Sequence, residues 1–103
     1  NMPTYVPLPD CLTLKQSNVH GLGLFATKNI PDNTELGLSH LIIKGSLFRT
    51  PLGGFYNHSV RPNCIKYEKN NLDQKITYYY LRTIRNISAG EEVTVTYTFY
   101  DIE

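Results

Sequence analysis

The sequence has no tryptophan, one methionine and only two cysteines among its 103 residues. Cys11 and Cys64 could form at most one disulfide, and no segment resembles a signal peptide. Small secreted domains are usually rich in disulfides, whereas free thiols persist in reducing compartments. We therefore expect two free thiols and an intracellular protein, although the sequence does not indicate which compartment.

The sequence also lacks a strong charge of either sign and a long apolar run. Ten lysines and arginines stand against nine aspartates and glutamates, which gives a net charge of +1. Such a chain has no overall field to attract nucleic acid or an anionic membrane. No apolar run approaches the roughly 20 residues that span a bilayer. We expect no direct nucleic-acid partner, no membrane partner and no internal repeat.

The residues that are abundant are typical of strands and turns. Eight tyrosines, four phenylalanines, six prolines and seven glycines accompany several runs of β-branched residues. A length of 103 residues suits one small domain. Pro3, Pro7 and Pro9 deny a helix to residues 1–10, which are expected to form an extended lead-in to a single domain at 11–103. The fold is predicted to be mainly β, with little helix.

Alternating apolar and polar residues place the strands. Ser39 and His40 stand between two of them, and His40 is expected to be a partly exposed loop histidine, because no neighbouring carboxylate or cysteine would orient it. The successive tyrosines 78–80 put rings on both faces of one strand, which favours sheet packing over a nucleic-acid stacking platform. The expected strands are 12–16, 34–38, 41–44, 65–68 and 76–83, the last two forming a hairpin.

Two glycines, Gly21 and Gly23, alternate with the apolar residues Leu22 and Leu24. In an extended chain both glycines face the same side, so that another group can approach the backbone there. A bulge or a close strand crossing is the simpler explanation of the pattern. A dinucleotide-binding loop is excluded, because the third glycine and the following helix are absent.

The stretch from Gly53 to Cys64 is the strongest site candidate from residue chemistry alone. It contains two glycines, an Asn-His-Ser triplet and a Pro-Asn turn within twelve residues. An ordinary core strand does not combine permissive backbone, polar side chains and a rigid turn. Farther on, Glu91 and Glu92 form either a solvated turn or an acidic rim for a basic partner.

Three blocks of this sequence, taken in order, resemble the signature motifs of the SET domain family. They are His-Gly-Leu-Gly-Leu-Phe-Ala at 20–26, Asn-His-Ser at 57–59 with Pro-Asn-Cys at 62–64, and Gly-Glu-Glu-Val-Thr-Val-Thr-Tyr at 90–97. The resemblance extends from about Leu12 to Tyr100. It implies a β-clip-like fold of several small sheets, with a knot-like crossing between the Asn-His-Ser segment and the C-terminal segment.

The resemblance also implies a reaction and a set of site residues. SET enzymes transfer a methyl group from S-adenosylmethionine to the side-chain amine of a lysine in a protein or peptide. By resemblance, the cofactor is bound by Gly21, Leu22, Gly23, Asn57, His58 and Tyr100, the catalytic residue is Tyr97, and the substrate channel is lined by Tyr56 and Phe99. Plain core packing is the alternative for Tyr56. No metal is predicted, because the cysteine-rich zinc segments of many family members are absent.

The sequence departs from the family pattern in three places. The aromatic-x-Gly block that usually follows the first turn is represented only by Leu36-Gly37-Leu38. Gly53 and Gly54 stand where an arginine often opens the Asn-His-Ser block, and the insert between the first two blocks is short, from about Leu41 to Leu52. An inactive SET-like protein-binding module is therefore the alternative function. Because the insert normally helps to shape the substrate groove, a homodimer could complete a minimal domain of this kind.

Overall fold

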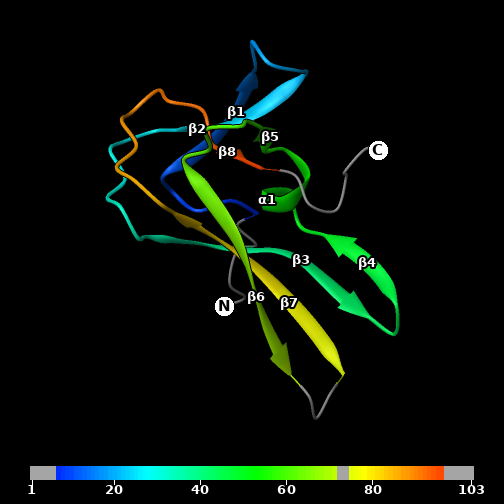
Figure 1. The fold of residues 1–103 in the computed structure, drawn as a ribbon. Coiled ribbons are helices and arrows are strands. Elements are labelled where there is room, and N and C mark those ends of the chain that lie inside the picture. The colour runs from blue at the N-terminus through cyan, green and yellow to red at the C-terminus, as the bar shows by residue number, and fades with distance from the viewer. Residues whose placement is uncertain (1–6, 72–74, 97–103) are drawn as a thin grey trace, which may run out of the picture.

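The computed structural model describes residues 7–71 and 75–96, and these are mainly strands with one short helix (Figure 1). The tyrosine-rich and proline-rich composition therefore predicted the fold class correctly. No helix within the described ranges is long and apolar enough to cross a membrane. The elements are β1 (Leu12–Gln16), β2 (Leu22–Ala26), β3 (Glu35–Ile43), β4 (Ser46–Arg49), α1 (Pro51–Gly54), β5 (Asn57–His58), β6 (Cys64–Asn71), β7 (Ile76–Thr83) and β8 (Thr94–Val95).

The described strands form three small sheets, as the family resemblance implied. β1 and β2 make an antiparallel hairpin, and the largest sheet has the order β4-β3-β7-β6. The third sheet pairs β5 with β8 in parallel, with Asn57 opposite Thr94 and His58 opposite Val95. The segment near the C-terminus therefore runs beside the Asn-His-Ser segment, although 37 positions separate the two residues in each pair (Figure 1).

The expectation of two strands separated by a loop at Ser39 and His40 is wrong. β3 is one strand, and its pairing with β7 shifts register between Leu38 and His40. The extra residue of this bulge turns both Ser39 and His40 inward, where each is 0% exposed. Ser39 Oγ donates to the Tyr79 carbonyl at 3.0 Å and lies 3.0 Å from His40 Nδ1. Burial, with help from the nearby positive charges of Lys66 and Arg49, lowers the pKa of His40 to about 4.

Helix α1 follows a threonine cap and rests against β3. Thr50 Oγ1 accepts from the backbone amide of Gly53 at 3.3 Å and donates to the Leu38 carbonyl at 2.6 Å. Pro51 suits the first helical position, where no amide hydrogen is needed. A side chain at Gly53 would place Cβ 2.0 Å from the backbone oxygen of Ser39, so glycine is required for this contact. A helix was not predicted here because one turn gives no apolar periodicity.

Two turn segments pack against each other as a pair. Both begin with Asn-Ile and have a Glu five residues after the Ile, at 29–35 and 86–92. Ile30 and Ile87 exchange both backbone hydrogen bonds at 2.8 Å. Each preceding asparagine accepts from the opposite turn, Asn29 Oδ1 from Ala89 N at 2.9 Å and Asn86 Oδ1 from Asp32 N at 2.8 Å. The corresponding residues Asn33 and Gly90 both have positive φ, 63° and 90°.

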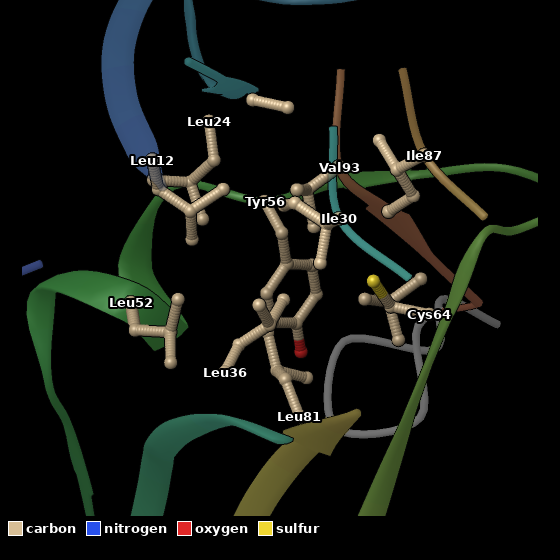
Figure 2. Close-up of a cluster of buried hydrophobic side chains, with 12 residues drawn as sticks. Leu12, Leu24, Ile30, Leu36, Leu52, Tyr56, Cys64, Leu81, Ile87 and Val93 are labelled. Atoms are coloured by element: carbon tan, nitrogen blue, oxygen red, sulfur yellow. The ribbon is translucent and has the colours of Figure 1, made fainter. Parts of the chain in front are cut away.

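One apolar core joins the three sheets and lies between them (Figure 2). Leu24 and Leu81 are each 0% exposed, and Figure 2 shows them with the ring of Tyr56 between the surrounding aliphatic side chains. Val93 and Val95, at 0% and 2% exposed, anchor the segment that contains β8 in the same core. Burial of Val93, together with the isolated bridge between Glu92 and Phe25 of β2, fixes the place of Glu92.

Candidate functional site

The carboxylate of Glu92 joins three separate parts of the chain. Ser17 Oγ, just after β1, donates to the two carboxylate oxygens at 2.9 and 2.8 Å. Asn57 Nδ2, on β5, donates to Glu92 Oε2 at 2.7 Å and lies 3.2 Å from both Ser17 Oγ and the His20 carbonyl oxygen. We call Ser17, Asn57 and Glu92 the Glu92 cluster. It ties the turn before the two glycines to the Asn-His-Ser segment.

Gly23 is needed for the Glu92 cluster to form. A Cβ at this position would lie 2.3 Å from Glu92 Oε2 and 3.2 Å from Asn57 Nδ2. The space that the second glycine leaves is thus filled by side chains of this chain. Gly21 differs, because its φ is +50° and a Cβ there would meet no described heavy atom within 4 Å. Left-handed backbone explains glycine at this position, and the neighbouring Leu22 is 51% exposed. The backbone at Gly21 is therefore open to an incoming molecule.

Asn57 and His58 are held in place by backbone pairing to β8. Asn57 is 4% exposed, and its amide group points into the Glu92 cluster. His58 is half-buried and lies opposite Val95. Ser59 continues the pairing, since its amide donates to the Val95 carbonyl at 3.2 Å and its carbonyl accepts from Thr96 Oγ1 at 2.9 Å. The structure thus brings the second and third sequence blocks side by side.

Asn63 is the second link between these blocks. Its side chain donates to the Glu92 carbonyl at 2.7 Å and accepts from the Thr94 amide at 2.9 Å, and its own amide donates to Thr94 Oγ1 at 3.2 Å. Asn63 is 1% exposed, and it makes with residues 92–94 the hydrogen bonds that a neighbouring strand would otherwise make. The sequence analysis had assigned it only a turn.

Three functional assignments from sequence need revision or addition. Ser17 was read as a turn residue, although its hydroxyl is central to the Glu92 cluster. Glu92 is neither a solvated turn residue nor part of an acidic rim, because its carboxylate is engaged inside the protein. Glu91 is bound as well, accepting from Arg85 at 3.0 Å and from the Ser88 amide at 2.8 Å, and these contacts lower its pKa. In the sequence, only the Ser-Asn turn before the glycines indicated that Ser17 could belong to the site.

The remaining predicted residues divide into two groups. The ring of Tyr56 lies in the core, 4% exposed, with its centroid 6.1 Å from that of His40 in an edge-to-face arrangement (Figure 2). This position agrees with the core-packing alternative, and a role in the channel stays a prediction. Tyr97, Phe99 and Tyr100 lie outside the described residues.

A pocket of about 310 Å³ opens between β6 and β8. Apolar carbon dominates its wall, and burial raises the pKa of the Cys64 thiol in that wall to about 12. Cys11 and Cys64 are both free, as predicted. The pocket is lined by Pro62, Cys64, Ile65, Lys66, Ile84, Val95 and Thr96.

The SET domain sequence model matches residues 38–98, more than half of the chain. The protein belongs to the SET domain family. The match contains the second and third sequence blocks, including Tyr97, and the structure adds the first block through the Glu92 cluster.

Solved structures support the SET fold independently. A crystal structure of a candidate histone methyltransferase from Plasmodium falciparum superposes with a TM-score of 0.72 at 18% identity, covering 87% of this chain and 95% of that one. An apo ctPRC2 structure with two substitutions in Ezh2 gives a TM-score of 0.65 at 18% identity, covering 84% of this chain and 15% of that one. A comparison with curated proteins found no match. At these identities the structural likeness establishes the fold alone.

Proposed function

We propose that this SET domain transfers a methyl group from S-adenosylmethionine to the side-chain amine of a lysine in a protein or peptide. The Glu92 cluster is the observation that carries the proposal. It holds the open backbone at Gly21 and the Asn57-His58 strand together, although 37 positions lie between Asn57 and the His20 carbonyl. SET-domain methyltransferases generally use S-adenosylmethionine, and by resemblance the blocks at 20–26 and 57–64 would bind it here.

The residues present fit the methionine part of this cofactor. Gly21 leaves its backbone uncovered, and Asn57 is held beside it by the hydrogen bond from its Nδ2 to Glu92. The carboxylate of Glu92 behind them gives the site a negative charge, which complements the ammonium and sulfonium groups of the cofactor. Gly21, Leu22, Gly23 and Asn57 would hold the amino-acid end, and His58 with Tyr100 would hold the adenine end.

The substrate amine must lose a proton before it can act as a nucleophile. A lysine with a pKa of about 10.4 is mostly a cation at neutral pH. An apolar channel disfavours that cation, and a neighbouring sulfonium disfavours it further. The bound cofactor supplies an already activated methyl group, so the protein contributes alignment and exclusion of water. In this proposal the Tyr97 hydroxyl orients the amine, while Phe99 and Tyr56 wall the channel.

A protein-binding module without transferase activity is the second candidate. The observation in its favour is that the Glu92 cluster satisfies its own polar groups. Ser17 and Asn57 both donate to Glu92, so the cluster would be stable without a ligand. The same groove would then serve as a protein contact. A homodimer is compatible with either function.

Labelled S-adenosylmethionine separates the two candidates. Incubation of the chain with cell-extract proteins should place label on lysines, as read by mass spectrometry. Tyr97→Phe should lower turnover by at least about tenfold while binding of the cofactor changes little, because the hydroxyl acts on the reacting groups. If the variant reacts as fast as wild type, the catalytic assignment is wrong. If wild type neither binds nor transfers, the binding module is favoured.

A further inference from the structure

Lys66 is an unusual lysine among those that the structure describes. Its stem is half-buried on β6, and its Nζ atom is shielded from solvent. Lysine nitrogens usually remain in water while the stem packs against apolar surface. The Nζ atom lies 5.8 Å from the centroid of the Tyr79 ring. A lysine held inward in this way needs a structural or chemical reason.

The surroundings of Lys66 connect it to the proposed methyl-transfer site. Lys66 lines the 310 Å³ pocket between β6 and β8, and Val95 and Thr96 form the opposite wall. On its other side, β8 pairs with β5, where Val95 lies opposite His58. The pocket and the proposed cofactor residues are therefore separated by a single strand. Thr96 is also the residue directly before Tyr97.

The pocket wall has the character expected of a channel for a lysine side chain. Ile65, Ile84 and Val95 supply aliphatic surface, and Pro62 and Cys64 complete it. Such surroundings accommodate four methylene groups and disfavour the charged form of an amine. The neutral amine is the form that attacks a methyl group. Lys66, one of the residues that line this pocket, is an amine-bearing side chain of the chain itself.

We propose that Lys66 is a self-methylation site, modified by the same chain that carries it. The proposal rests on the proposed methyltransferase function and names one substrate for it. In the reaction, Lys66 Nζ gives up a proton to solvent and its lone pair forms the new N–C bond. The methyl–sulfur bond of S-adenosylmethionine breaks as the N–C bond forms, and the electron pair stays on sulfur, which leaves as a neutral thioether.

Lys69 is the matched control on the same strand. It lies three residues further along β6, its side chain is 54% exposed, and its Nζ atom lies 3.5 Å from Glu35 Oε1. Lys69 Nζ also lies 4.3 Å from the ring centroid of Tyr80. Lys69 therefore contacts a tyrosine ring, as Lys66 does, but it does not line the pocket. If the contact between a lysine ammonium and a tyrosine ring were purely structural, neither Lys66 nor Lys69 would be methylated.

The first test needs no cofactor. The folded chain is treated with an amine-acylating reagent, and the labelling rate of each lysine is followed by peptide mass spectrometry. Lys69 should react at once, and Lys66 should react only after unfolding. Equal rates for Lys66 and Lys69 in the folded chain would contradict the burial of Lys66 Nζ, and with it the proposal.

The second test follows methyl transfer in the purified chain with S-adenosylmethionine. The mass of one methyl group should appear on Lys66 at a first-order rate that does not change on tenfold dilution, since the reaction is within one chain. Lys66→Arg should abolish this label, whereas Lys69→Arg should keep it. Lys66→Met, which fills the pocket with an apolar chain of similar length, provides a second variant if the arginine variant fails to fold.

The outcomes separate this proposal from the function on which it rests. Label on extract proteins but never on Lys66 refutes self-methylation and leaves the methyltransferase assignment standing. Label on Lys66 that slows on dilution refutes modification within one chain. If no lysine is labelled and S-adenosylmethionine does not bind, both proposals fail together.

Discussion

The two adjacent glycines of α1 should respond in opposite ways to alanine. Cβ of an alanine at position 53 would lie 2.0 Å from the Ser39 backbone oxygen and 3.0 Å from His40 Cε1. A backbone atom cannot rotate away, so α1 must move off β3. At position 54 a Cβ meets no described heavy atom within 4 Å, and φ is not positive. Gly54→Ala therefore only lowers the backbone conformational entropy of the unfolded chain.

The size of the Gly53→Ala effect follows from the contacts that the shift breaks. The Thr50 amide donates to the Ser39 carbonyl at 2.9 Å, and Thr50 Oγ1 donates to the Leu38 carbonyl at 2.6 Å. Each such bond contributes about 1 kcal/mol, and overpacking adds about 1–3 kcal/mol. We expect Gly53→Ala to lower the free energy of unfolding by about 3 kcal/mol. Gly54→Ala should be neutral or stabilise by up to about 1 kcal/mol.

Urea unfolding measures this difference directly. The chain has no tryptophan, so the transition is followed by tyrosine fluorescence and by far-ultraviolet circular dichroism. The two variants differ by one methyl group at neighbouring positions, which makes each the control of the other. If Gly53→Ala unfolds within about 0.5 kcal/mol of wild type, α1 does not rest on β3 as described.

Three further outcomes are expected. The folded-state pKa of His40, about 4, lies below its ordinary value of 6.5, so the unfolded chain takes up the proton first as the pH falls. Stability should be full above pH 6.5 and decline towards pH 4 by up to about 3 kcal/mol, and His40→Gln should flatten this part of the pH profile measured by urea unfolding. Gly23→Ala should displace the Glu92 carboxylate, which its Cβ would approach to 2.3 Å, and cost about 2 kcal/mol in the same assay; an unchanged midpoint would count against the cluster. Sedimentation should show a dimer if a second copy completes the groove, and a fully active monomer would exclude that arrangement.

The sequence predicted elements whose signals are local. The strand expected at 12–16 coincides with β1, and the one at 76–83 coincides with β7 and pairs with β6 as expected. Regular alternation and a polar connection carry this information within a few residues. The burial of Ser39 and His40 could not be predicted, because a bulge that buries two consecutive polar residues depends on partners from β7 and α1. Those partners are distant in sequence.

The residues of the candidate site could likewise be predicted only in part. Glycine, asparagine and histidine at 21–23 and 57–58 were recognisable by residue type and order. The roles of Ser17, Asn63 and Glu92 were not, because each depends on hydrogen bonds to residues at least 29 positions away. A serine after a strand or a glutamate in a turn has the same local signature whether it is solvated or central to a site. Only the packing of β8 beside β5 distinguishes these cases.

Calorimetry with S-adenosylmethionine on Glu92→Gln and its neighbour Glu91→Gln tests the central claim most directly. Glu92 joins the glycine turn to Asn57, whereas Glu91 pairs with Arg85 at the surface. Wild type and Glu91→Gln should bind one equivalent with equal affinity, and Glu92→Gln should bind about tenfold more weakly, the loss of about one charged hydrogen bond. No binding by wild type, or equal binding by both variants, would contradict the account.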